Sequence, residues 1–93
     1  MKKRLHIFVS GKVQGVSFRH NARELAEKLP LVGWICNLRD GRVEILVEGE
    51  DHKIQEFLSW CYKGPIEAVV QDVVFDFEKP EGDFFDFRIT YQE

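Results

Sequence analysis

The chain has few cysteines and no excess of basic residues, and both shortages exclude whole classes of protein. Its two cysteines, Cys36 and Cys61, lie far apart without CxxC spacing, so they form neither a disulfide framework nor a zinc site. We expect two buried free thiols, although one pairing stays open. The formal net charge is −3, so the broad positive surface of a nucleic-acid-binding protein is missing. Any anion site must therefore be local.

Long apolar runs and metal-ligand patterns are missing as well. No stretch could span a bilayer, and the apolar run after residues 1–4 meets polar residues too soon for a secretory signal. His6, His20 and His52 share no metal-ligand spacing, and each is more simply a surface or partly buried histidine than a base, although the role of His20 stays open because it adjoins Arg19. We therefore expect a cytoplasmic protein that has no membrane attachment, no metal and no cofactor.

The 93 residues are enough for one small core, with 44% hydrophobic and 31% charged side chains. We expect a single domain over residues 1–93, and a monomer. Apolar residues spaced three and four apart predict two helices. The first begins near Phe18 and is stopped by Pro30, and the second follows a cap at residues 49–51 and ends at Gly64-Pro65. Alternating or Val- and Phe-rich runs predict strands at 5–10, 34–38, 43–47, 68–77 and 85–91.

The turn between the two middle strands and the order of elements predict the fold class. Asp40-Gly41 predicts a two-residue type I′ hairpin. The order is β-α-β-β-α-β with an extra terminal strand. Right-handed crossovers fold that order into an α+β, ferredoxin-like sandwich, with an antiparallel sheet and both helices on one face. This architecture hosts many functions, so particular residues must decide among them.

The stretch between the first predicted strand and the first predicted helix has the chemistry of a phosphate site. Residues 11–19 read GKVQGVSFR. Gly11 and Gly15 let the backbone bend or approach a ligand, and the start of the helix adds unpaired N–H groups and the positive end of its dipole. Arg19 can donate two parallel hydrogen bonds to phosphate oxygens. A tight turn followed by a solvated arginine is the plainer alternative. No Gly-Lys-Ser/Thr follows, so this is not a Walker loop.

A second stretch, residues 33–43, reads GWICNLRDGRV and places Asn37 at the end of a strand. Asparagine suits a strand poorly, because its side chain competes for backbone hydrogen bonds and buries little apolar surface. Its carboxamide can accept a hydrogen bond from water while it donates one to a phosphate oxygen. Asn37 could therefore orient a water nucleophile, or it could merely lie near the hairpin turn.

Together the two stretches closely resemble both signatures of the acylphosphatase family, and the resemblance extends over essentially the whole chain. It implies hydrolysis of the carboxyl–phosphate bond of small acyl phosphates without a metal or cofactor. It also implies that Arg19 and Asn37 are catalytic, Arg19 by binding phosphate and Asn37 by positioning the attacking water. The residues whose backbone N–H groups would bind the substrate, together with that of Arg19, are Gln14, Gly15, Val16, Ser17 and Phe18. Leu38 departs from the family where some relatives carry a hydroxyl residue that supports the asparagine.

Three other interpretations stay open at this point. A phosphate-sensing ferredoxin-like module could keep the loop without turnover, although Asn37 argues against it. A carbamoyl-phosphate-handling domain of a larger maturation protein would share both motifs, yet the chain ends soon after its last strand. Ser17 could be imagined as a phosphoryl-accepting nucleophile, but no base is placed beside it by a motif. We expect a standalone enzyme with no nucleic-acid partner.

Overall fold

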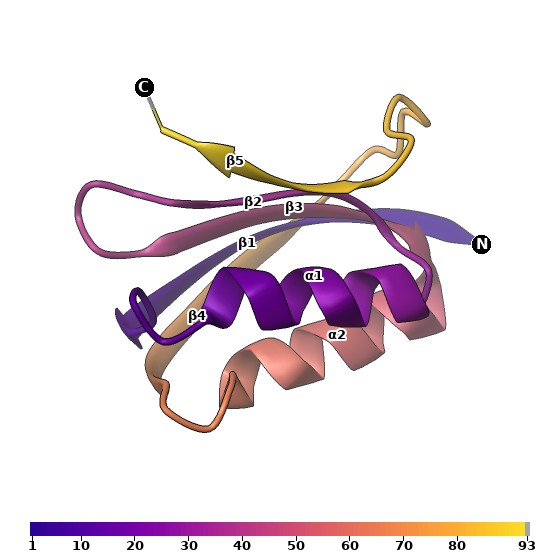
Figure 1. Ribbon diagram of the computed structural model, residues 1–93. Helices are drawn as coiled ribbons and strands as arrows, with labels where there is room; N and C mark the ends of the chain where they lie inside the picture. Colours follow the sequence, from indigo (N-terminus) through magenta and orange to yellow (C-terminus); the bar gives the residue numbers. More distant parts are fainter. Residues whose placement is uncertain (93) are drawn as a thin grey trace.

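The computed structural model describes residues 1–92, which fold into five strands and two helices in the predicted order. Both helices pack side by side against one face of the sheet (Figure 1). Apart from the direction of one edge strand, this is the expected ferredoxin-like sandwich. The elements are β1 (Lys2–Lys12), α1 (Phe18–Lys28), β2 (Val32–Asn37), β3 (Val43–Glu50), α2 (Asp51–Lys63), β4 (Val69–Glu78) and β5 (Phe87–Tyr91).

The sheet has the strand order β4-β1-β3-β2-β5 and is mixed. Neighbouring strands are antiparallel except β2 and β5, which pair in parallel, so the prediction of a purely antiparallel sheet was wrong at this edge. The reason is the path of residues 79–86, which carry the chain from the β4 edge across to the opposite edge (Figure 1). β5 then enters from the same end of the sheet as β2. Its partners there include Asn37, which lies opposite Tyr91.

The core lies between the sheet and the two helices, as the spacing of apolar residues predicted. Leu5, Ile7 and Val9 of β1 are completely buried on the helix-facing side. Ala22 and Ala26 of α1 are also inaccessible to solvent, as are Ile54, Phe57 and Cys61 of α2. This packing fixes where α1 begins relative to the ends of β1 and β2, and the candidate site depends on that geometry.

The face of the sheet opposite the helices carries a buried ion pair. Nε of Arg4 donates to Oε2 of Glu48 at 2.8 Å, and the N–H of Gly82 donates to Oε1 of Glu48 at 2.9 Å. Arg4 also bonds Asp83. Burial raises the pKa of Glu48, but the hydrogen bonds from Arg4 and from the backbone outweigh it and lower that pKa overall. The pair holds residues 79–86 against the sheet.

The hairpin between β2 and β3 has a three-residue loop, so the prediction of a two-residue type I′ turn was wrong. The N–H of Leu38 donates to the carbonyl of Arg42 at 2.8 Å, and that of Gly41 donates to the carbonyl of Leu38 at 3.1 Å. Gly41 has φ +99°, whereas Asp40 lacks the positive φ that type I′ requires. The geometry is that of a type I turn followed by a glycine bulge, in which Arg39, Asp40 and Gly41 form the loop.

Cys36 and Cys61 are both free and buried, as expected. Cys61 belongs to the core, whereas Cys36 belongs to the opposite face of the sheet, because it alternates with the core residue Ile35. Burial raises the pKa of both thiols. Within residues 1–92, no helix has the length and apolar character that crossing a membrane requires. The same residues contain no group of three or more metal-ligating side chains suited to hold an ion.

Candidate active site

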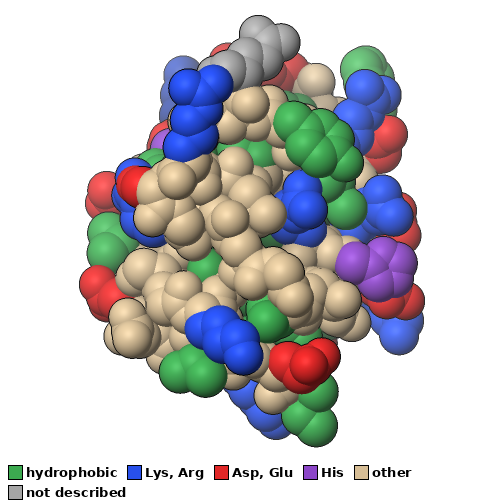
Figure 2. Space-filling view, turned by 60° about the vertical axis from the view of Figure 1, so that its left-hand side comes forward, with side chains coloured by type: hydrophobic (Ala, Val, Ile, Leu, Met, Phe, Trp, Pro, Cys, Tyr) green, Lys and Arg blue, Asp and Glu red, His purple; other side chains and the backbone are tan. Residues whose placement is uncertain are grey.

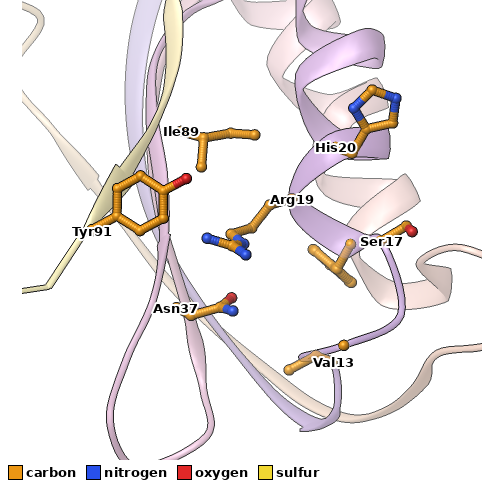
Figure 3. A pocket seen from close by; sticks show the side chains of 9 residues that line it. Val13, Ser17, Arg19, His20, Asn37, Ile89 and Tyr91 are labelled. Atoms are coloured by element: carbon orange, nitrogen blue, oxygen red, sulfur yellow. The ribbon is translucent and has the colours of Figure 1, made fainter.

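A cavity of about 350 Å³ opens where the β1–α1 loop, the end of β2 and the end of β5 meet. The close-up in Figure 3 shows its labelled side chains grouped around Arg19. Figure 2 turns this end of the molecule forward, and the acidic side chains there lie mainly toward the rim of the view. The lining residues are Val13, Gly15, Ser17, Phe18, Arg19, His20, Asn37, Ile89 and Tyr91.

In the loop that leads into α1, two residues with positive, left-handed φ angles are separated by one residue without a positive φ. Gly15 has φ +74° and Ser17 has φ +64°, and Ser17 is the only non-glycine residue with positive φ among residues 1–92. Alternation of right- and left-handed residues turns successive N–H groups toward one side, forming an anion-binding concavity called a nest. The sequence motif therefore coincides with a backbone shape suited to an oxyanion.

The start of α1 is left available for a ligand. Ser17 is the N-cap residue, but in the described chain its side chain makes no capping hydrogen bond, and the first turn of α1 has no acidic residue. The carbonyl of Ser17 accepts hydrogen bonds from the backbone N–H of Asn21 at 3.1 Å and from Nδ2 of Asn21 at 2.8 Å. These bonds hold the left-handed residue in place. The N–H groups of the first turn, which have no partner within the helix, and the positive end of the helix dipole favour an anion here.

Arg19 projects from the first turn of α1 into the middle of the cavity, between Tyr91 and Asn37 (Figure 3). Its guanidinium carbon lies 5.6 Å from the centroid of the Tyr91 ring. The residue is half-buried, and its guanidinium lies in the cavity (Figure 3). A guanidinium beside a helix N-terminus supplies positive charge and paired donors from two directions.

Asn37 is the last residue of β2, and its side chain points toward Arg19 (Figure 3). Its Oδ1 atom is buried and has no hydrogen-bond partner within residues 1–92. Buried polar atoms nearly always have a partner, and an exception needs an explanation. A ligand or water in the cavity would supply it. Asn37 is therefore a polar group aimed at the cavity rather than part of the turn.

The structure brings most of the predicted site residues together. Gln14 and Val16 are the exceptions, because neither lines the cavity: Val16 is buried, and the Gln14 side chain bonds the β2–β3 hairpin. The Ser17 hydroxyl points away from Arg19 (Figure 3), so the geometry does not favour a serine nucleophile. The predicted residues that do line the cavity are Gly15, Ser17, Phe18, Arg19 and Asn37.

Sequence reasoning missed three lining residues and left the role of a fourth open. Val13, Ile89 and Tyr91 were not selected. For Ile89 and Tyr91 the reason is that alternation in residues 85–91 indicated a strand but not its neighbour. Only the parallel register of β5 with β2 places Tyr91 opposite Asn37. His20 lies at the rim, where Nε2 is 3.2 Å from a carboxylate oxygen of Glu24 on the surface.

The family assignment follows from comparison with known proteins. A family model described as Acylphosphatase matches residues 5–89. The chain belongs to the acylphosphatase family. A curated relative named Acylphosphatase, from Trichormus variabilis, is 51% identical over 79 residues, which are 85% of this chain and 78% of the relative.

Solved acylphosphatase structures agree with that assignment over nearly the whole chain. An acylphosphatase from Coxiella burnetii has a TM-score of 0.91 and 42% sequence identity, with 96% of this chain and 93% of that chain covered. An acylphosphatase from Bacillus subtilis has a TM-score of 0.92 and 36% identity, with 98% of this chain and 100% of that chain covered. Fold and sequence thus identify the same family.

Proposed function

We propose that this acylphosphatase hydrolyses the carboxyl–phosphate bond of small acyl phosphates, giving a carboxylate and inorganic phosphate. The observation that carries the proposal is one cavity in which a helix N-terminus, the Arg19 guanidinium and the unpartnered Oδ1 of Asn37 converge. Family membership indicates the reaction, and these groups supply what that reaction needs.

The phosphoryl group would bind at the left-handed loop. The N–H groups of residues 14–19 and the Arg19 side chain would donate to its oxygens, with the dipole of α1 favouring the negative charge. As the reaction proceeds, charge on the phosphoryl oxygens is stabilised by donors that are already in place. This positioning and charge stabilisation accounts for most of the catalysis in phosphoryl transfer.

Asn37 would position the nucleophile. Its Oδ1 would accept a hydrogen bond from a water while Nδ2 donates to a phosphate oxygen. The water oxygen then forms a bond to phosphorus, and the bond from phosphorus to the carboxyl oxygen breaks. The leaving carboxylate takes that bond's electron pair, and a phosphate oxygen of the substrate takes the proton of the water. A carboxylate is a good leaving group, so no strong general base is required.

Three expectations about the setting of the enzyme stay predictions. They are that residues 1–93 act as a standalone domain, that the protein is a monomer, and that it works in the cytoplasm. A partner beyond the small-molecule substrate is not needed for the proposed reaction, because the loop before α1, Arg19 and Asn37 all belong to this chain.

The test is hydrolysis of benzoyl phosphate in excess EDTA, with inorganic phosphate as a competitive inhibitor to report binding. We expect Arg19→Ala to lose phosphate binding and turnover together. Asn37→Ala should keep phosphate binding while kcat falls about a hundredfold to a thousandfold, the usual cost of removing one such contact.

Arg23→Ala is the matched control, because it removes a second arginine of α1 that does not line the cavity. It should behave like the wild type. An Asn37→Ala enzyme that kept most of its kcat would contradict the water-positioning role. A folded wild-type protein that bound phosphate without hydrolysing benzoyl phosphate would instead be the phosphate-sensing module.

A further inference from the structure

The Gln14 side chain links the anion-binding loop to the hairpin that carries Asn37. Its Nε2 atom donates to the carbonyl of Leu38 at 2.7 Å and to the carbonyl of Arg42 at 3.0 Å. A carboxamide nitrogen has two hydrogens, so these two bonds use its full donor capacity. The side chain is half-buried and does not line the cavity. Whatever it contributes to the site therefore passes through the hairpin.

The two acceptors are the residues that close the hairpin. The carbonyl of Arg42 also accepts the N–H of Leu38 at 2.8 Å, so Gln14 joins the hydrogen bond that ends the β2–β3 ladder. Leu38 directly follows Asn37 in the chain. Beyond this point only the exposed loop of Arg39, Asp40 and Gly41 remains. Gln14 thus fixes the end of β2 at the carbonyl of Leu38, the residue after Asn37.

Apart from the backbone pairing of Asn37 with Val43 and Tyr91, little holds its carboxamide in place. Its Oδ1 has no partner within residues 1–92, and the neighbouring Leu38 offers no side-chain hydroxyl or amide. The direction of the carboxamide therefore depends on where the β2 backbone places its Cα atom. An error of about 1 Å in such a group can cost on the order of a hundredfold in rate.

We propose that the Gln14 side chain is a positioning residue that sets Asn37 against the anion-binding loop, so that water and phosphate are held in the right relation. The inference rests on the proposed function, because its expected effect on kcat presupposes acyl phosphate hydrolysis. It assigns the side chain of Gln14 a role separate from that of its backbone N–H, which would belong to the phosphate cradle.

Gln14→Met tests this, because methionine keeps the length of the side chain and removes both donors. Gln55→Met is the matched control, since Gln55 lies exposed on α2 and does not line the cavity. We expect Gln14→Met to lower kcat for benzoyl phosphate about tenfold to a hundredfold. Its inhibition constant for inorganic phosphate should stay within about threefold of the wild type, and the control should change neither quantity.

A double-mutant cycle with Asn37→Ala separates positioning from general damage. If Gln14 acts through Asn37, adding Gln14→Met to Asn37→Ala should lower kcat by less than about twofold. A loss as large in that background as in the wild type would overturn the proposal. So would a Gln14→Met enzyme with wild-type kcat in a preparation where Asn37→Ala has lost turnover, and the proposed function would then still stand.

A second readout does not depend on turnover. The side-chain NH₂ signals of Asn37, assigned by their loss in Asn37→Ala, should shift when wild-type protein is titrated with inorganic phosphate. In Gln14→Met the backbone signal of Gly15 should still shift, while the response of Asn37 is lost or reduced. An unchanged response of Asn37 would overturn the proposal even if the wild-type protein proved unable to hydrolyse acyl phosphates.

Discussion

The Arg19 guanidinium faces the Tyr91 ring, with its central carbon 5.6 Å from the ring centroid. The contact joins the start of α1 to the edge strand β5, and it exists because β5 pairs in parallel with β2 and sets Tyr91 opposite Asn37. Tyr91 as a whole is 76% exposed, so its packing contributes little to the core. We expect its main effect to be on Arg19, which it would hold on the side of the cavity that faces Asn37 (Figure 3).

Tyr91→Leu should therefore weaken substrate and phosphate binding without unfolding the protein. An exposed cation–π contact is worth about 0.5–1 kcal/mol, so KM and the inhibition constant for phosphate should rise roughly twofold to fivefold. Tyr91→Phe keeps the ring and should match the wild type in both constants. If the two variants were equally impaired, the hydroxyl rather than the ring would be the important group.

Gly15 provides a second test, because its backbone and not its surroundings requires glycine. It has φ +74°, and a Cβ atom built there would meet no atom within 4 Å. Gly82 has φ +68° and equally open space, but it lies far from the cavity, beside Glu48. Both Gly15→Ala and Gly82→Ala should lose about 1–2 kcal/mol of stability to urea. Only Gly15→Ala should also bind phosphate more weakly. If both variants bound phosphate equally well, the left-handed conformation at Gly15 would not be needed for phosphate binding.

Much of the site could be predicted because several of its residues are neighbours in the sequence. The glycine, the left-handed cap and Arg19 lie within five residues of one another, and the helix begins at Phe18 as its spacing indicated. Asn37 was selected for a different reason. An asparagine at the end of a strand is unfavourable, but position alone left it open between a role in the site and a place near the turn. The resemblance to the two family signatures, and not local chemistry alone, decided in favour of a site at both stretches.

The rest depends on which strands are neighbours, and that is a property of the whole chain. Tyr91 enters the site only through the register of β5 on β2, and Gln14 reaches the hairpin across 24 residues of sequence. The error at Asp40-Gly41 was local but ambiguous: the same dipeptide fits a two-residue type I′ loop or the last two positions of a three-residue loop. The closing pair of Leu38 and Arg42 decides between them.

The buried pair of Arg4 and Glu48 makes the fold sensitive to acid. The pKa of Glu48 is lowered in the folded protein, so the unfolded chain takes up this proton more readily. The stability that ionised Glu48 contributes is complete above the ordinary glutamate pKa. It is lost as the pH falls through the lowered pKa of Glu48 in the folded protein. Urea unfolding between about pH 6 and pH 2 should show this loss in the wild type and much less of it in Glu48→Gln. That variant is already less stable at neutral pH, because Arg4 keeps a buried charge without its partner. Glu56→Gln, which removes an exposed carboxylate of α2, should follow the wild-type curve. Parallel curves for wild type and Glu48→Gln would place the acid sensitivity elsewhere in the molecule.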